Sequence, residues 1–193
     1  MRKSFILGLV AIGATALVAR GDIIPTLNPA SPAAAVGGFT WNYATNVTLD
    51  QKVTTGDFFT IYDFGSFNAG SNIQPAGWAF SSSLVGTTPA LVLPNDSGSL
   101  LNLTWTYTGT AELVGAQFLG DFSVIAESNQ LRTSDFAAEA TRSNGPNVGS
   151  KVDNIGRTSV PIPEMSALLP ILSVCGAGLV AGIPSFLRRR KNS

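Results

Sequence analysis

Histidine is absent from this chain of 193 residues, and cysteine occurs once, at Cys175. Without histidine, the chain lacks the usual general base, the commonest metal ligand and an essential member of every Ser-His-Asp or Cys-His arrangement. Cys175 lies inside a C-terminal apolar run, so the preceding part of the chain has neither a disulfide nor a thiolate metal site. We therefore predict no catalytic residues, no metal site and no cofactor, and we do not expect an enzyme.

Charged residues are also scarce, at 12% of the chain, and the formal net charge is zero. Most of the bases lie at the two ends of the chain, whereas residues 22–159 contain five bases and eleven acids, a formal charge of −6. Binding to nucleic acid requires grouped lysines and arginines that neutralise phosphates. The mildly acidic middle of the chain therefore argues against a nucleic-acid partner.

An apolar run near the N-terminus follows two bases, Arg2 and Lys3. The run covers residues 5–18, and small residues follow at Ala19 and Gly21. A positive start, a short apolar stretch and small residues before a cleavage point are typical of a secretory signal peptide. We predict a signal peptide over residues 1–21. The alternative, an uncleaved anchor, needs about 20 apolar residues, and this run is shorter.

A longer apolar run lies near the C-terminus and covers residues 165–187, which are 23 residues without a charge. A helix of this length measures about 34 Å at about 1.5 Å per residue, enough to cross a hydrocarbon layer of about 30 Å. A basic stub follows directly, formed by Arg188, Arg189, Arg190 and Lys191. Because bases remain on the cytoplasmic side, we predict a transmembrane helix with its C-terminus in the cytoplasm. A buried core helix, the alternative, rarely ends in such a basic block.

A short proline-glutamate motif precedes this predicted span: Val160 and Pro161 lead into Pro163 and Glu164. The order of motif, single span and basic stub resembles the PEP-CTERM sorting tail, which is also called the ice-binding-protein C-terminal domain. The resemblance covers residues 160–191. The chain departs from the family pattern at Met165, where the family normally has a second proline.

The resemblance to this tail has implications for partners and location. It implies recognition by an exosortase-type processing enzyme and transient anchoring in the inner membrane. It further implies removal of the tail and delivery of the protein to the cell surface or extracellular matrix. It implies nothing about the activity of the exported domain.

The middle of the chain is predicted to be all-β, because short apolar runs alternate with Gly, Ser, Thr and Asn about every ten residues. The clearest strand covers residues 101–108, where Leu101, Leu103, Trp105 and Tyr107 alternate with polar residues. Further strands are expected at residues 39–43, 46–53, 58–64, 78–82, 90–93, 113–118 and 122–126. The pattern favours an antiparallel β-sandwich or jelly-roll-like ectodomain over residues 22–142.

Two segments beside this ectodomain have the composition of linkers. Residues 22–38 are rich in Pro, Ala and Gly, although Ile23 and Ile24 are compatible with an edge strand. Residues 143–159 are rich in Asn, Gly and Ser and indicate a flexible stalk before the tail. The pattern shows no convincing amphipathic helix, and the best short candidate covers residues 134–141.

The exported domain is expected to be structural or adhesive. A carbohydrate-binding module, with an extracellular polysaccharide as partner, is the alternative. Trp78 follows a loop-like Pro-Ala-Gly segment and is the best candidate for an aromatic platform under a sugar. Packing in the core is the alternative for the tryptophans, and the sequence favours it. A small enzyme with a carboxylate pair is a distant third alternative.

Two further binding functions have weaker support in the sequence. Oxygen ligands for calcium are available, but without the spacing of a loop site; the candidates are Asp57, Asp63, Asp96 and Asp121. Alternate threonines on one strand face are a feature of ice-binding surfaces, and residues 104–110 contain such an array. Threonine is also an ordinary residue of a solvated strand face, so one strand does not establish an ice-binding grid.

Overall fold

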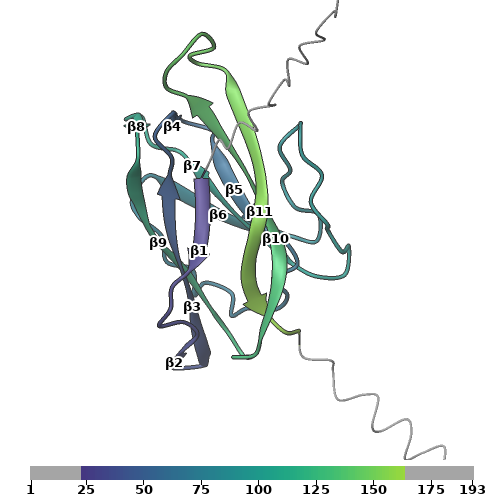
Figure 1. Cartoon of the computed structure of the whole chain (residues 1–193). Coiled ribbons are helices and arrows are strands. Elements are labelled where there is room, and N and C mark those ends of the chain that lie inside the picture. The colour runs from purple at the N-terminus through teal and green to yellow at the C-terminus, as the bar shows by residue number, and fades with distance from the viewer. Residues whose placement is uncertain (1–22, 164–193) are drawn as a thin grey trace, which may run out of the picture.

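The computed structural model describes residues 23–163, which form β-strands and loops without a helix (Figure 1). Each strand is antiparallel to its neighbours, so the predicted all-β class with antiparallel pairing is confirmed. The strands are β1 (Ile23–Leu27), β2 (Ala33–Ala35), β3 (Gly38–Val47), β4 (Gln51–Val53), β5 (Phe58–Ile61), β6 (Trp78–Ser83), β7 (Asn102–Tyr107), β8 (Leu113–Val114), β9 (Gln117–Ala126), β10 (Leu131–Arg142) and β11 (Lys151–Pro161).

The strands form two sheets. In the smaller sheet, β1 and β2 pair with successive parts of β3, and β9 pairs with β3 as well. In the larger sheet the order is β6-β7-β5-β10, and β11 also pairs with β10. Two short strands complete the larger sheet: β4 pairs with the last two residues of β10, and β8 pairs with β4.

The two sheets share one apolar core, to which alternate residues of each strand contribute. The ring of Phe59 in β5 stacks on Trp105 of β7 with a centroid distance of 5.1 Å. The ring of Phe122 in β9 meets Phe59 edge to face at 5.0 Å, which joins the two sheets. Trp41 and Tyr43 of β3 are completely buried in the same core.

The predicted flexible stalk over residues 143–159 is wrong. Residues 151–159 belong to β11, which pairs with β10 over the whole length from Thr141↔Lys151 to Leu131↔Pro161. Only the hairpin loop over residues 143–150 lies outside the strands. The domain therefore continues past the predicted boundary at residue 142 to the end of β11 at Pro161 (Figure 1).

Other strand predictions have mixed outcomes. The strand expected at residues 101–108 is confirmed as β7, with Leu103, Trp105 and Tyr107 buried. Residues 90–93 lie in a loop instead of a strand, and residues 134–141 belong to β10 instead of a helix. The predicted linker over residues 22–38 contains β1 and β2, in agreement with the edge strand considered at Ile23.

The predicted signal peptide, transmembrane helix and basic stub lie outside the described residues. Within residues 23–163, no helix is long and apolar enough to cross a membrane.

Candidate functional site

The first half of the predicted sorting motif is part of the folded domain. Val160 is completely buried and pairs with Arg132 of β10, and Pro161 is the last residue of β11. The guanidinium of Arg132 donates hydrogen bonds to the carbonyl of Pro161, at 3.1 Å, and to the carbonyl of Asp63. The lead-in to the motif is therefore fixed by the sheet and does not extend freely.

The chain separates from the sheet over the next two residues. The amide of Ile162 still donates to the carbonyl of Gln130 at 2.8 Å, and its side chain is 44% exposed. Pro163 lies beside Gly65, and Glu164 lies outside the described residues. A small hollow with room for about one water molecule lies here, lined by Phe64, Ser66, Glu127, Ser128, Pro161, Ile162 and Pro163.

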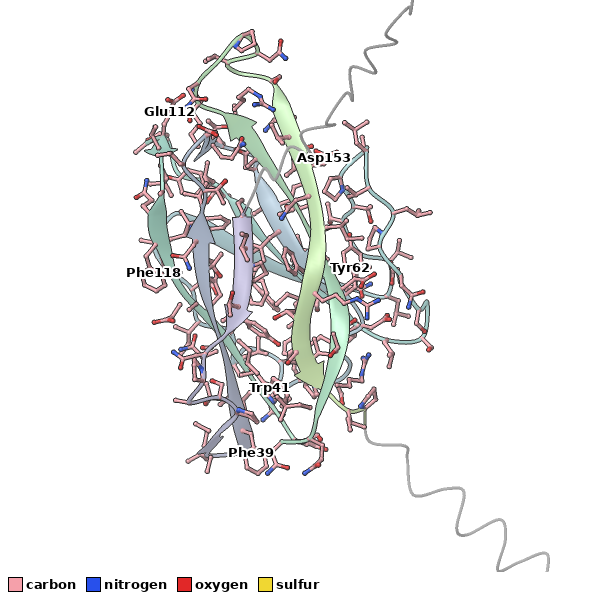
Figure 2. All side chains as sticks on the ribbon, viewed as in Figure 1. Phe39, Trp41, Tyr62, Glu112, Phe118 and Asp153 are labelled. Carbon is pink, nitrogen blue, oxygen red and sulfur yellow. The ribbon has the colours of Figure 1, made fainter. Side chains whose placement is uncertain are left out.

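A second feature is the long loop between β6 and β7, which covers residues 84–101 and is called the β6–β7 loop. It crosses the outer face of the larger sheet (Figure 2). Pro89 and Pro94 are buried, whereas Leu91 and Leu93 are 82% and 92% exposed. Val85 in the same loop is 73% exposed, so the loop presents several apolar side chains to solvent.

Carboxylates on the sheet fix the backbone of this loop. Asp153 of β11 accepts a hydrogen bond from the amide of Leu91 at 2.7 Å. Asp135 of β10 accepts one from the amide of Asn95 at 2.9 Å, and Asp63 accepts one from the amide of Ser97 at 2.8 Å. Hydrogen bonds to ionised acceptors are stronger than those between neutral groups. The β6–β7 loop is thus held in one conformation by acids from three separate segments.

Hydroxyl groups add a second set of contacts beneath the loop. The side chains of Tyr62 and Thr60 both donate to the carbonyl of Thr87, at 2.7 and 2.8 Å. Burial, together with the nearby Asp96, raises the pKa of Tyr62, although hydrogen bonds with Thr88 and Thr60 oppose the change. Tyr62 therefore remains a neutral donor throughout the neutral pH range.

Trp78 does not form the exposed sugar platform considered for it but packs in the core. Trp78 begins β6 and is only 6% exposed. Its ring packs at 5.0 Å from Phe122 and at 5.2 Å from Tyr107, inside the shared core. The other two tryptophans, Trp41 and Trp105, are completely buried. The strand expected at residues 78–82 is confirmed as β6, and its first residue faces the core.

The threonines considered over residues 104–110 do not form one exposed face, because Thr104 is buried whereas Thr108 and Thr110 are exposed. Thr104 is buried, and its hydroxyl lies 2.9 Å from that of Thr60 on the neighbouring strand. Thr60 in turn contacts the β6–β7 loop through the Thr87 carbonyl. The polar side of β7 is thus a surface on which this loop packs.

Three of the four acidic residues considered for calcium take part in structural contacts, namely Asp57, Asp63 and Asp96, whereas Asp121 is exposed. Asp57 is completely buried and accepts hydrogen bonds from the amide of Thr54, at 2.7 Å, and from Thr141. Lys151 closes this site by pairing with Asp57, and it lies 3.4 Å from Glu139. Within residues 23–163, no three acidic or cysteine side chains gather in a group that could hold a metal ion.

The ionic contacts of Lys151 affect its titration. Burial lowers its pKa, but the hydrogen bond and charge of Asp57, with a further contribution from Glu139, outweigh burial and raise the pKa overall. Lys151 is consequently a charged partner for the buried carboxylate at neutral pH. This arrangement stabilises the β10–β11 hairpin and leaves Asp57 without a free lone pair directed to solvent.

The β6–β7 loop was not predicted from the sequence as a surface feature. The usable signal was the spacing of Pro89 and Pro94 around the alternating residues Leu91 and Leu93. Because a proline lacks an amide donor, two of them so close together argue against the strand that was expected at residues 90–93.

Comparison with protein-family models and with curated proteins found no match to this chain.

Proposed function

We propose that this protein is an exported β-sandwich module that a C-terminal tail sorts to the cell surface or extracellular matrix, where it has a structural or adhesive role. The tail comprises the motif at Pro163 and Glu164, the apolar run over residues 165–187 and the basic stub over residues 188–191. An exosortase-type enzyme removes this tail after the inner membrane has held it transiently. The two sheets with a common core support assignment of the exported part to the sandwich class.

The main support for this proposal is the position of the last strand, β11, relative to the predicted tail. β11 ends at Pro161, and only three residues separate it from the apolar run that begins at Met165. An extended chain advances at most about 3.6 Å per residue, so the end of β11 would lie within about 15 Å of the membrane. The domain and its tail are therefore contiguous, and the short connector between them contains the processing motif.

The exposed side chains of the β6–β7 loop support an adhesive role. Val85, Leu91 and Leu93 are displayed on a backbone that three carboxylates hold in place. Apolar groups that gather at the surface of a soluble domain mark contact sites for other molecules. Fixing them in advance lowers the conformational entropy that binding costs.

The experiment compares the full chain with a variant that stops after Pro163. This boundary keeps all of β11, whereas removal from residue 160 would delete the buried Val160 and damage the domain. We expect the full chain to appear first in the inner-membrane fraction and then in the matrix as a shorter form. The shortened variant should be exported without passing through the membrane-bound stage.

A matched control replaces Glu164 with Gln in the full chain, which keeps the span and the stub. We expect this variant to accumulate in the inner membrane without processing. Identical fractionation and maturation of the full chain and the variant ending at Pro163 would overturn the proposal.

A further inference from the structure

The outer edge of β11 is free along most of its length. β11 is eleven residues long and pairs only with β10 among the described strands. Two hydrogen bonds at the ends of the β10–β11 ladder show which residue pairs are bonded. The amide of Arg142 donates to the carbonyl of Ser150, and the amide of Ile162 donates to the carbonyl of Gln130. In an antiparallel ladder the bonded pairs alternate with non-bonded ones. Even-numbered residues of β11 therefore bond β10, and odd-numbered residues direct their amides and carbonyls outward.

The surroundings of this edge confine the free portion to residues 151–157. The carbonyl of Ser159 accepts a hydrogen bond from the Tyr43 hydroxyl at 2.8 Å, so it already has a partner. β1 of the other sheet approaches β11 through Asn154, whose side-chain amide lies 3.5 Å from the carbonyl of Ile23. Asn154 has an even number, so its side chain lies on the inner face and its contact with β1 uses none of the outward backbone groups. Within residues 23–163, no backbone partner bonds the outward groups of Lys151, Asp153, Ile155 and Arg157.

We infer that a second copy of this chain pairs with this edge, antiparallel to it, with Ile155 opposite Ile155 of the partner copy. In this register Asp153 of each copy lies opposite Arg157 of the other, because the two residues are equally spaced about Ile155. The symmetric arrangement forms two opposite-charge pairs, which stabilise neighbouring strands when they lie directly opposite. Odd-numbered residues oppose odd-numbered residues, so their outward amides and carbonyls bond each other.

The charges also disfavour other registers. Centring the pair on Asn154 would place Lys151 opposite Arg157 twice. Centring it on Asp153 would oppose two aspartates, and centring it on Arg157 would oppose two arginines. Like charges directly opposite each other destabilise paired strands. Centring the pair on Val152 would place Lys151 opposite Asp153, but Lys151 is already paired with Asp57 and lies 3.4 Å from Glu139 within its own chain. Of the registers that oppose unlike charges, the one centred on Ile155 is therefore the one whose charged side chains do not have to leave that buried site.

Apolar side chains next to the edge give this pairing a surface to bury. Ile155 is 45% exposed on the outer face of β11. The amide of Leu91 donates a hydrogen bond to Asp153, and the Leu91 side chain is 82% exposed. Pairing about Ile155 brings the side chains of Ile155 and Leu91 of each copy toward the partner copy. This removes apolar surface from water, in addition to the backbone hydrogen bonds that the pairing forms.

Disulfide cross-linking tests this register. Residues in a bonded antiparallel pair have Cα atoms about 5.5 Å apart, which suits a disulfide. The full chain carrying Cys175→Ser and Ile155→Cys, purified in detergent and treated with a mild oxidant, should form a cross-linked dimer. The matched control carries Arg157→Cys, whose two copies would lie about 14 Å apart and should not cross-link. A monomeric Ile155→Cys protein, or equal cross-linking of the control, would overturn the inference.

A charge-reversal series gives a second readout without cysteines. Arg157→Asp places aspartates opposite each other and should lower the association constant at least about tenfold in analytical ultracentrifugation. The double variant Asp153→Arg with Arg157→Asp again opposes unlike charges and should recover association. Recovery in the double variant is incompatible with a merely structural role of Arg157. Failure to recover, with unchanged circular dichroism, would count against the charge pairing and hence against this register. The cross-linking result does not depend on tail processing, so it can fail while the proposed function stands.

Discussion

The two faces of the larger sheet are covered in different ways. On the inner face, Phe59 contacts Trp105, Trp78 and Phe122 at centroid distances between 5.0 and 5.9 Å. On the outer face, the β6–β7 loop is attached through hydrogen bonds to Asp135 and Asp153. Apolar packing is non-directional and stabilises the whole domain, whereas hydrogen bonds fix the position of one segment. The inner face therefore provides global stability, and the outer face provides the geometry of the exposed surface.

The largest effect is expected from a change on the inner face. Phe59→Ala removes a completely buried ring from the centre of the aromatic cluster. Such substitutions cost about 3–5 kcal/mol through lost burial and the cavity left behind. Chemical denaturation followed by fluorescence should show this loss in the free energy of unfolding.

Leu93→Ala is the matched control for this comparison. Its side chain is 92% exposed, so the free energy of unfolding should change by less than about 0.5 kcal/mol. A similar loss in the free energy of unfolding for Phe59→Ala and Leu93→Ala would mean that the inner face does not contribute more to global stability than the outer face.

Alkaline pH should weaken the contact between the core and β11. Burial raises the pKa of Tyr43 well above its usual value, and the ion pair with Asp57 outweighs burial to raise that of Lys151. In both cases the folded protein holds a proton that the unfolded chain loses more readily. The stabilisation is complete below the unfolded pKa values, near about 10, and is lost as pH rises through the folded values. Stability measured from about pH 8 to about pH 11.5 should therefore fall above about pH 10.

Tyr43→Phe separates the contributions of these two groups. The variant loses the hydrogen bond to the Ser159 carbonyl, so it should be about 1 kcal/mol less stable at neutral pH. Because it has no proton to lose at this position, its stability should decline less steeply above about pH 10. A decline as steep as that of the unchanged protein would exclude Tyr43 as a source of the alkaline effect.

The predictability of a strand depended on whether its pattern was local. β7 was visible in the sequence because Leu103, Trp105 and Tyr107 are apolar at every second position. In β11 the inner positions include Asn154, Gly156 and Thr158, so the period of two is hidden. Gly156 is explained only by the fold, since a Cβ there would lie 2.6 Å from the ring of Phe136. Contacts of this kind cannot be read from composition.

The predicted tail and the β6–β7 loop also differ in how far each could be predicted from local sequence. The motif, apolar run and basic stub of the predicted tail are contiguous and could be proposed from residue order alone. The β6–β7 loop depends on pairs such as Leu91 with Asp153, which are 62 positions apart in the sequence. A turn-rich segment with two prolines gives no indication of which distant acids will bind its amides. The surface that this loop presents therefore became apparent only once the strands had been placed.

The smallest effect is expected from a change at one of these acids on the outer face. Asp135→Ala removes the acceptor of the Asn95 amide, while the sheet and the aromatic core remain intact. A single hydrogen bond to a charged acceptor contributes about 1.5–3 kcal/mol when buried, and less at this partly exposed position. We expect a loss of about 1 kcal/mol or less in global stability, but faster cleavage of the β6–β7 loop under limited proteolysis, because local opening exposes the loop without unfolding the domain.

The control for this prediction is Asp121→Ala. Asp121 is an exposed residue of β9, in the other sheet, so its loss should alter neither global stability nor cleavage of the loop. The sites of cleavage, identified by mass spectrometry, should fall near Leu93 in the Asp135→Ala variant. Cleavage that instead increases throughout the domain would indicate global destabilisation, and the outer face would then contribute to overall stability in the same way as the inner one. Unchanged cleavage would mean that the remaining anchors, Asp63 and Asp153, are sufficient to hold the loop.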